Sequence, residues 1–316
     1  MPHAQLAAWV WPAWLAPDPC LPYFLGAVIL ILGLVMFSKQ APARPGLDRI
    51  VALGPLFIAV PLAVFAGDHF MAARAMTDML PSWIPGHLFW IYFVGVCLIA
   101  AALSLVLNRY AGLAAALFGI MMLLFELFLH IPGAVSDPNN RFSWTIVLRE
   151  LSFSGGALAL AGTYTEAWRK HGTHVVITVA RFFIGIPIVF FGVEQLLHPA
   201  FVPAVPLNKL TPSWIPAHSL WGYPVGAVFV VAGLCLILNQ QTRRAATWLG
   251  VVILLTVVVI YVPMNIANAG DIANGLNYLA DTLLLAGSVL AIAGAQPKTG
   301  VRQTARSTGV QTARVA

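Results

Sequence analysis

Charged residues are scarce in this chain of 316 residues, because only 9% are Asp, Glu, Lys or Arg. Soluble globular domains carry roughly 25% of such residues. A chain with so little polar surface is not an ordinary soluble globule. Its net charge of +6 is no sign of nucleic-acid binding, since the Lys and Arg residues lie in short connections and a terminal tail. We expect no nucleic-acid partner and a lipid bilayer as the surroundings.

Cysteine is rare as well. Cys20, Cys97 and Cys235 form no C-x-x-C pair, which argues against disulfide exchange and against a zinc site. The sequence also lacks a Walker A loop, a G-x-G-x-x-G segment after a strand and an H-E-x-x-H motif. Nucleotide binding and zinc proteolysis are therefore unsupported. We expect no metal site and interpret the cysteines as small apolar residues.

Apolar residues are what the chain has in abundance: they make up 60% of it, and the mean hydropathy is +0.86. A transmembrane helix needs roughly 20 apolar residues. A β-barrel needs alternating segments of about 10 residues, and these do not dominate. The sequence predicts an all-α polytopic membrane protein. We expect nine spans, at residues 21–37, 50–68, 87–107, 111–131, 144–164, 174–195, 219–239, 245–264 and 275–295.

The Lys and Arg residues are unevenly shared between the two sets of connections. One set, together with the C-terminal tail, holds twelve, and the other set holds three. Positive residues favour the cytoplasmic side. We expect a protein of the inner (cytoplasmic) membrane with its C-terminus in the cytoplasm and its N-terminus outside. Residues 1–49 would form a Trp-rich interfacial segment and the first span. Residues 296–316 would form a disordered basic tail.

The pentapeptide PSWIP occurs twice, at residues 81–85 and 212–216, on the expected outer side. Sliding the sequence by 131 residues superimposes the two copies and aligns many further positions without a gap. This register predicts two tandem four-helix units, 50–164 and 174–295. Because each unit has an even number of spans, both insert the same way round. A pseudo-two-fold axis along the membrane normal would relate them.

Small residues and prolines recur in this register. The pairs Gly95/Gly226 and Gly156/Gly287 are expected where helices approach closely. Pro132/Pro263 is expected to stop a helix at its outer end. Each PSWIP segment is expected to be a rigid interfacial connector, with Trp83 or Trp214 at the level of the lipid headgroups.

Ionisable groups inside a bilayer are costly, so those within the spans are functional candidates. Glu126 and His130 are four residues apart on one helix and share a face. With Glu150 they are the catalytic candidates. The residues expected to line a substrate or quinone site are His69, Trp83, His87, Glu126, His130, Arg149, Glu194, His198, Trp214, His218, Tyr261 and Asp281. Their positions predict a polar pocket at the outer mouth of each unit, under PSWIP.

A structural reading stays open for the same residues. Arg149 and Glu150 are adjacent, and adjacent residues on a helix do not face each other, so each is expected to need another partner. Glu150 and its counterpart Asp281 would then stabilise helix contacts. Arg181 lies nearer the cytoplasmic side, where snorkelling explains it. Haem is not expected, because the candidate ligands His69, His87 and His130 show no paired spacing on facing helices.

Several stretches resemble the DoxX-like family. They are FFGVEQLLHP (190–199), the PSWIP turns with the aromatic, glycine-containing helices after them (FWIYFVG and LWGYPVG), and LRELSFSGGALALAG (148–162) with its weaker copy LADTLLLAG (279–287). The resemblance covers both four-helix units. The first unit departs from the pattern at GDHFMAA, which lacks the His-Pro, and the second lacks the basic residue at Ala280. The usual member of the family has a single unit.

The resemblance implies quinone-linked electron transfer, since the family takes its name from subunits of a terminal quinol oxidase. Three functions remain open. The first is a quinone-interacting or accessory subunit of a membrane redox complex, with quinone as the cofactor and other subunits as partners. The second is a small-solute transporter or channel, which a polar path through Arg181 would favour. The third is a non-catalytic assembly or scaffold protein.

Overall fold

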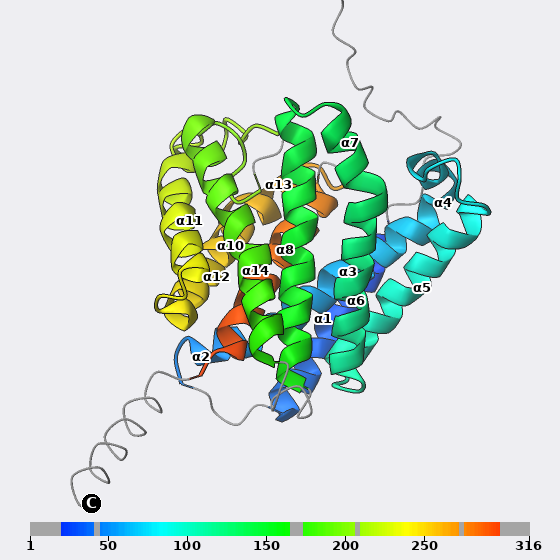
Figure 1. Cartoon of the computed structure of the whole chain (residues 1–316), viewed down its shortest axis with the longest axis horizontal. Coiled ribbons are helices and arrows are strands. Elements are labelled where there is room, and N and C mark those ends of the chain that lie inside the picture. The colour runs from blue at the N-terminus through cyan, green and yellow to red at the C-terminus, as the bar shows by residue number, and fades with distance from the viewer. Residues whose placement is uncertain (1–19, 41–44, 165–172, 206–208, 272–274, 298–316) are drawn as a thin grey trace, which may run out of the picture.

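The computed structural model describes residues 20–40, 45–164, 173–205, 209–271 and 275–297 (Figure 1). Within them the chain is a bundle of helices without a β-strand, and its one isolated antiparallel bridge joins Phe201 to Leu210. The all-α prediction is confirmed. The predicted interfacial segment and disordered tail fall almost wholly on residues outside the described ranges.

A helix is found in each of the nine predicted ranges. The long helices are α1 (Cys20–Gln40), α3 (Gly54–Met71), α5 (His87–Val106), α6 (Ala111–Phe125), α8 (Arg141–Tyr164), α10 (Thr173–Leu197), α11 (Gly222–Ile237), α12 (Thr242–Thr256) and α14 (Leu276–Ala295). The short elements are α2 (Asp48–Ala52), α4 (Ala73–Met76), η1 (Thr77–Met79), η2 (Glu126–His130), α7 (Ile131–Ser136), η3 (Val257–Tyr261) and α13 (Val262–Ala267).

Seven helical stretches in the described part of the chain are long and apolar enough to cross a membrane. Helix α11 is apolar but shorter, and α8 carries Arg141, Arg149 and Glu150 in its first half. The outside of the bundle exposes large apolar side chains, among them Ile31, Val231 and Trp248. A surface of this kind needs an apolar solvent. The chain therefore has the features of a multi-pass membrane protein.

The bundle has two distinct ends. Helices α4 and α7 lie at one end, and α2 and the last residues of α14 lie at the other (Figure 1). Both PSWIP segments belong to the first end, because they directly precede the starts of α5 and α11. We call this end the motif end and the opposite one the tail end.

Two prolines change the helix type near the motif end instead of stopping the helix. Pro132 has no N–H to donate to the carbonyl of Phe128, and its ring crowds that carbonyl. The turn before it, Glu126–His130, is a π-helix, and α7 then continues to Ser136. Pro263 follows the second π-helix, η3, in the same way. The prediction that these prolines end their helices is wrong, because a wider turn relieves the clash.

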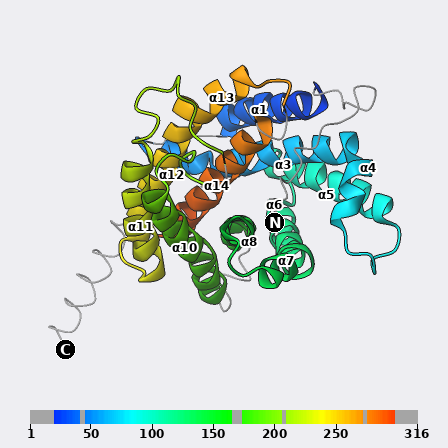
Figure 2. The same ribbon diagram turned by 90° about the horizontal axis from the view of Figure 1, so that it is seen from above.

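Helix α14 lies at the centre of the bundle, packed against α3, α8 and α12 (Figure 2). Helix α8 also packs against α6 and α10. Five helices, α3, α14, α8, α6 and α5, thus follow one another in a ring. The contact between α5 and α6 is the least extensive of the five. We refer to this arrangement as the five-helix ring.

Glycines set the closest crossings in the bundle. A Cβ atom on Gly156 of α8 would overlap Ser288 of α14, and one on Gly287 would lie 2.9 Å from the backbone nitrogen of Ile58 on α3. Gly226 of α11 meets the carbonyl oxygen of Gly192 on α10, 2.9 Å from where its Cβ would lie. The predicted role of these glycines in close packing is confirmed.

The described residues keep the 131-residue register in their backbone conformation. The two π-helices start at Glu126 and Val257, which are one register apart. Positive φ angles also occur in pairs one register apart: Gly86 and Ala217, Asn108 and Asn239, and Tyr110 and Gln241. The indole of Trp90 donates to the Pro85 oxygen, and that of Trp221 to the Pro216 oxygen. That the halves are copies of one unit stays a prediction, and these pairs support it.

Candidate functional site

Arg149 occupies the contact between α8 and α14. Its Nη1 donates to Asp281 Oδ2 at 2.6 Å, and its Nη2 and Nε donate to Glu150 Oε1 at 2.7 and 3.1 Å. All three side chains are mostly buried. The close crossing at Gly156 and Ser288, about two turns nearer the tail end, holds the helices near enough for Arg149 to reach Asp281.

This geometry corrects one expectation. Arg149 and Glu150 were expected to need separate partners because neighbours on a helix point apart. The long arginine side chain instead turns back to its neighbour while it reaches across to Asp281. Glu150 and Asp281, which the 131-residue register pairs, thus share one guanidinium. The counterpart of Arg149 in that register, Ala280, is buried and apolar.

Glu126 lies beside this ion-pair group. It opens the π-helix η2, is only 3% exposed, and neither of its carboxyl oxygens has a hydrogen-bond partner among the described residues. Glu126 and His130 both interact electrostatically with Arg149 and Glu150. The prediction that Glu126 and His130 share a face is therefore confirmed. We call Glu126, His130, Arg149, Glu150 and Asp281 the Arg149 cluster.

Two polar side chains from α3 and α14 extend the cluster toward the motif end. Asp68, near the end of α3, is 4% exposed, interacts with the side chain of Asn277, and lies within electrostatic range of Asp281. The Oδ1 atom of Asp68 has no hydrogen-bond partner among the described residues. Asp68 of α3 and Glu126 of η2 are therefore two buried carboxyls whose hydrogen bonding is incomplete among the described residues.

Sequence reasoning missed Asn277 and Tyr278 and left Asp68 out of the site. Asn277 and Tyr278 precede Asp281 by four and three residues, so helical spacing alone places them on its face. The Tyr278 ring also receives the ammonium of Lys209, 5.2 Å from the ring centre. Burial lowers the pKa of Lys209 from its ordinary value, and Asp271 opposes that change. Spacing would have found the α14 residues, whereas the approach of Asp68 depends on the packing of α3 against α14.

In the described part of the second half, an apolar cluster occupies the place that corresponds to Glu126 and His130. Tyr261, the counterpart of His130, is 1% exposed, and its hydroxyl donates to the carbonyl of Pro203 at 2.7 Å. It packs with Val202, Ile215 and Ile260 in an apolar cluster. Ile215 belongs to the second PSWIP segment, so that segment covers an apolar core. The expectation of one polar pocket in each unit is wrong for the second unit, because Val257 and Tyr261 replace its ionisable residues.

The first PSWIP segment lies close to the Arg149 cluster. The Trp83 ring meets Phe128, in the middle of η2, edge to face at 5.7 Å. Nε2 of His87 lies 3.1 Å from the Pro81 carbonyl oxygen and so ties the segment to the start of α5. Trp83 is 66% exposed. This segment therefore contacts the exposed face of the π-helix that carries Glu126 and His130.

The remaining predicted residues lie in other surroundings. Glu194 pairs with Arg141 at 3.3 Å and lies 3.9 Å from His198, and Arg141 stacks over the Phe201 ring. This group joins the first turn of α8 to the end of α10. His69 contacts its own helix through the Phe65 carbonyl oxygen. In the second PSWIP turn and the residues after it, Trp214 is exposed and His218 is half-buried. Glu194, His198, His69, Trp214 and His218 are therefore not part of the Arg149 cluster.

Comparison with known proteins does not identify this site. No family model, curated protein or solved structure matches the chain. Among the described residues there is also no group of three or more His, Cys, Asp and Glu side chains placed to hold a metal ion. The Arg149 cluster has to be interpreted from its own chemistry.

Proposed function

We propose that this membrane protein binds a lipid-soluble quinone at the Arg149 cluster and exchanges protons with it, as a subunit of a membrane redox complex. The observation that carries the proposal is Glu126, a carboxyl that is buried to 97% and has no hydrogen-bond partner among the described residues. A buried carboxyl without a donor is costly. Either a proton or a hydrogen bond from a ligand would satisfy it.

The residues around Glu126 suit a quinone head group. Such sites combine apolar walls with a few polar groups. Phe128 and Trp83 pack together on the exposed face of the same π-helix, while Glu126 and His130 supply two groups that can give or take a proton. Arg149 keeps a positive charge nearby, balanced by Glu150 and Asp281. The less extensive contact between α5 and α6 would let a lipid-soluble molecule enter from the bilayer.

A bound quinol would supply two protons and two electrons. Glu126 would take one proton on a carboxyl oxygen and His130 the other on a ring nitrogen, and both would pass to the water through His130, one turn nearer the motif end. The electrons would go to a metal cofactor of another subunit, which makes partners part of the proposal. The chain would be a tandem pair of DoxX-like units in the inner membrane, with its C-terminus in the cytoplasm, and only the first unit would hold the site.

Replacing Glu126 with glutamine tests this function. Purified protein in lipid nanodiscs is titrated with decylubiquinol, whose hydroxyl group can donate to the Glu126 carboxylate, and binding is followed by tryptophan quenching and by extraction of the bound quinol. We expect Glu126→Gln to weaken binding about 10-fold or more, the effect of losing one hydrogen bond to a charged group. Asp137→Asn is the control, because it removes an exposed carboxyl at the same end. Wild-type protein that binds no quinol, or a variant that binds it equally well, would refute the proposal.

An assembly role is the second candidate, and the paired state of Arg149 favours it. With both acids bonded to one guanidinium, the triad would hold α8 against α14. Transport has less support. Arg181 donates to the carbonyls of Leu236 and Ile237 at the end of α11, so it caps that helix and offers no polar path from the Arg149 cluster.

A further inference from the structure

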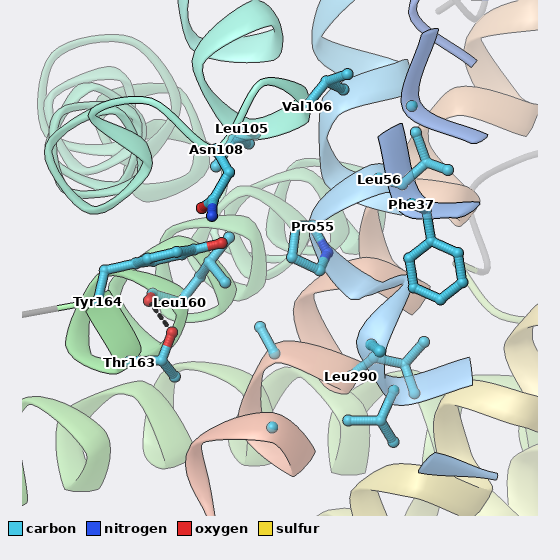
Figure 3. Close-up of a pocket in the computed structure, with 15 residues that line it drawn as sticks. Phe37, Pro55, Leu56, Leu105, Val106, Asn108, Leu160, Thr163, Tyr164 and Leu290 are labelled. Carbon is cyan, nitrogen blue, oxygen red and sulfur yellow. Dashed lines mark hydrogen bonds between the residues drawn. The ribbon is translucent and has the colours of Figure 1, made fainter. Parts of the chain in front are cut away.

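A cavity of about 450 Å³ lies at the tail end of the five-helix ring, opposite the Arg149 cluster (Figure 3). Residues of α1, α2, α3, α5, α8 and α14 line it. Most of the wall is apolar and includes Phe37, Leu56, Leu105 and Leu290. Its size falls within the range of small-molecule sites, roughly 300–1,000 Å³.

Among the described residues that line the cavity, none is Asp, Glu, Lys, Arg or His, so this part of its wall carries no charge. Its polar side chains are Asn108, Thr163 and Tyr164. The Thr163 hydroxyl donates to the Leu160 carbonyl oxygen at 2.7 Å. The Asn108 amide and the Tyr164 hydroxyl have no hydrogen-bond partner among the described residues, and they lie next to each other on one side of the cavity (Figure 3). The lining therefore offers hydrogen bonds without a counterion.

The polar pair lies where two helices end. Asn108 follows the last residues of α5, and Tyr164 is the last described residue of α8. Tyrosine at such positions favours the boundary between hydrocarbon and headgroups. An amphipathic molecule in the cavity would place its polar group beside Asn108 and Tyr164 and its apolar part against Leu56 and Leu290.

We propose that this tail-end cavity binds an uncharged, lipid-soluble molecule whose carbonyl oxygen accepts hydrogen bonds from Asn108 and Tyr164. Charged lipids are disfavoured, because burying a charge without a partner is costly. Quinones and monoacylglycerols share the required chemistry. The inference does not rest on the proposed function, since the cavity and the Arg149 cluster are built from different residues at opposite ends of the ring.

Gly294 of α14 allows the cavity to be filled. A Cβ there would have Val51 Cγ1 as its nearest neighbour, at 3.7 Å, an ordinary contact. Gly294→Leu therefore places a side chain in the cavity without a backbone clash. Tyr164→Phe removes only the hydroxyl and serves as a second variant if the first fails to fold. Gly133→Leu is the matched control, because a Cβ on Gly133 would meet no atom within 4 Å.

Native mass spectrometry of the full chain, titrated with decylubiquinone, monoolein and oleate, tests the proposal. We expect one saturable site for an uncharged probe, weakened about 10-fold or more by Gly294→Leu and roughly 3- to 10-fold by Tyr164→Phe. Binding of decylubiquinone would identify the ligand as a quinone, and binding of monoolein would identify it as a monoacylglycerol. If quinone binding is lost in Glu126→Gln but kept in Gly294→Leu, the quinone binds at the Arg149 cluster and not in the tail-end cavity.

Three results would overturn the inference of a tail-end site. They are no saturable binding of either uncharged probe, equal binding of oleate, or full binding by both Gly294→Leu and Tyr164→Phe. The control Gly133→Leu is expected to bind the probe as the wild type does, which assigns any loss in Gly294→Leu to the filled cavity. The Glu126→Gln variant should leave this site intact, so the two proposals can fail independently.

Discussion

Replacing Arg149 with methionine is expected to lower the free energy of unfolding by about 3–5 kcal/mol, the usual effect of removing one partner from a buried ion-pair group. The guanidinium satisfies Glu150 and Asp281 at the same time. Without it, two buried carboxyls would lie close together with no counterion. The effect should appear as a lower midpoint of denaturation in mixed detergent micelles.

Neutralising the acids should recover most of that loss. The triple variant Arg149→Met, Glu150→Gln, Asp281→Asn removes the uncompensated charge while it keeps the side-chain volumes similar, and buried ion pairs are often replaceable in this way. We expect it to unfold close to the wild-type midpoint. If Arg149→Met alone stays within about 1 kcal/mol of the wild type, the cluster does not hold α8 against α14.

The second large effect is expected at Gly156, where α8 and α14 cross most closely. A Cβ atom there would overlap both the Cα and the Cβ of Ser288. Backbone must therefore move to accept even alanine, and overpacking of this kind costs about 1–3 kcal/mol or more. The same denaturation measurement should show Gly156→Ala well below the wild type. Because the crossing sets the distance between Arg149 and Asp281, the variant should also weaken that ion pair.

Gly133→Ala is the control for the glycine prediction. Gly133 lies on α7, where an added Cβ would meet no atom within 4 Å, and alanine is favoured over glycine in a helix by roughly 0.5–1 kcal/mol. The control should be neutral or slightly stabilising. Equal stability of Gly156→Ala and Gly133→Ala would mean that the crossing is looser than the structure indicates.

Local patterns in the sequence predicted the helices and several of their contacts. The apolar runs located all nine helices, since each run is long enough to form one and has few polar residues to interrupt it. The 131-residue register picked out glycines that do lie at close crossings. Helical spacing placed Glu126 and His130 on one face, and both do interact with Arg149 and Glu150.

Other features depended on atoms far apart in the chain. The sequence predicted that Pro132 stops a helix, but the chain continues as a helix after a π-helical turn. It predicted a polar pocket in each unit, but in the second unit the Tyr261 hydroxyl donates to the Pro203 carbonyl oxygen within an apolar cluster. The tail-end cavity has no signature in the sequence, because its walls come from six helices.

The sequence by itself determined that this protein is a bundle of apolar helices and which of its few ionisable residues lie within them. Those properties follow from composition and from the helical repeat, which are local. Only the tertiary structure decided that Glu150 and Asp281 share Arg149, while Glu126 has no hydrogen-bond partner among the described residues. Charge pairing depends on how close two helices come and how each is rotated, and glycine crossings such as Gly156 with Ser288 set both.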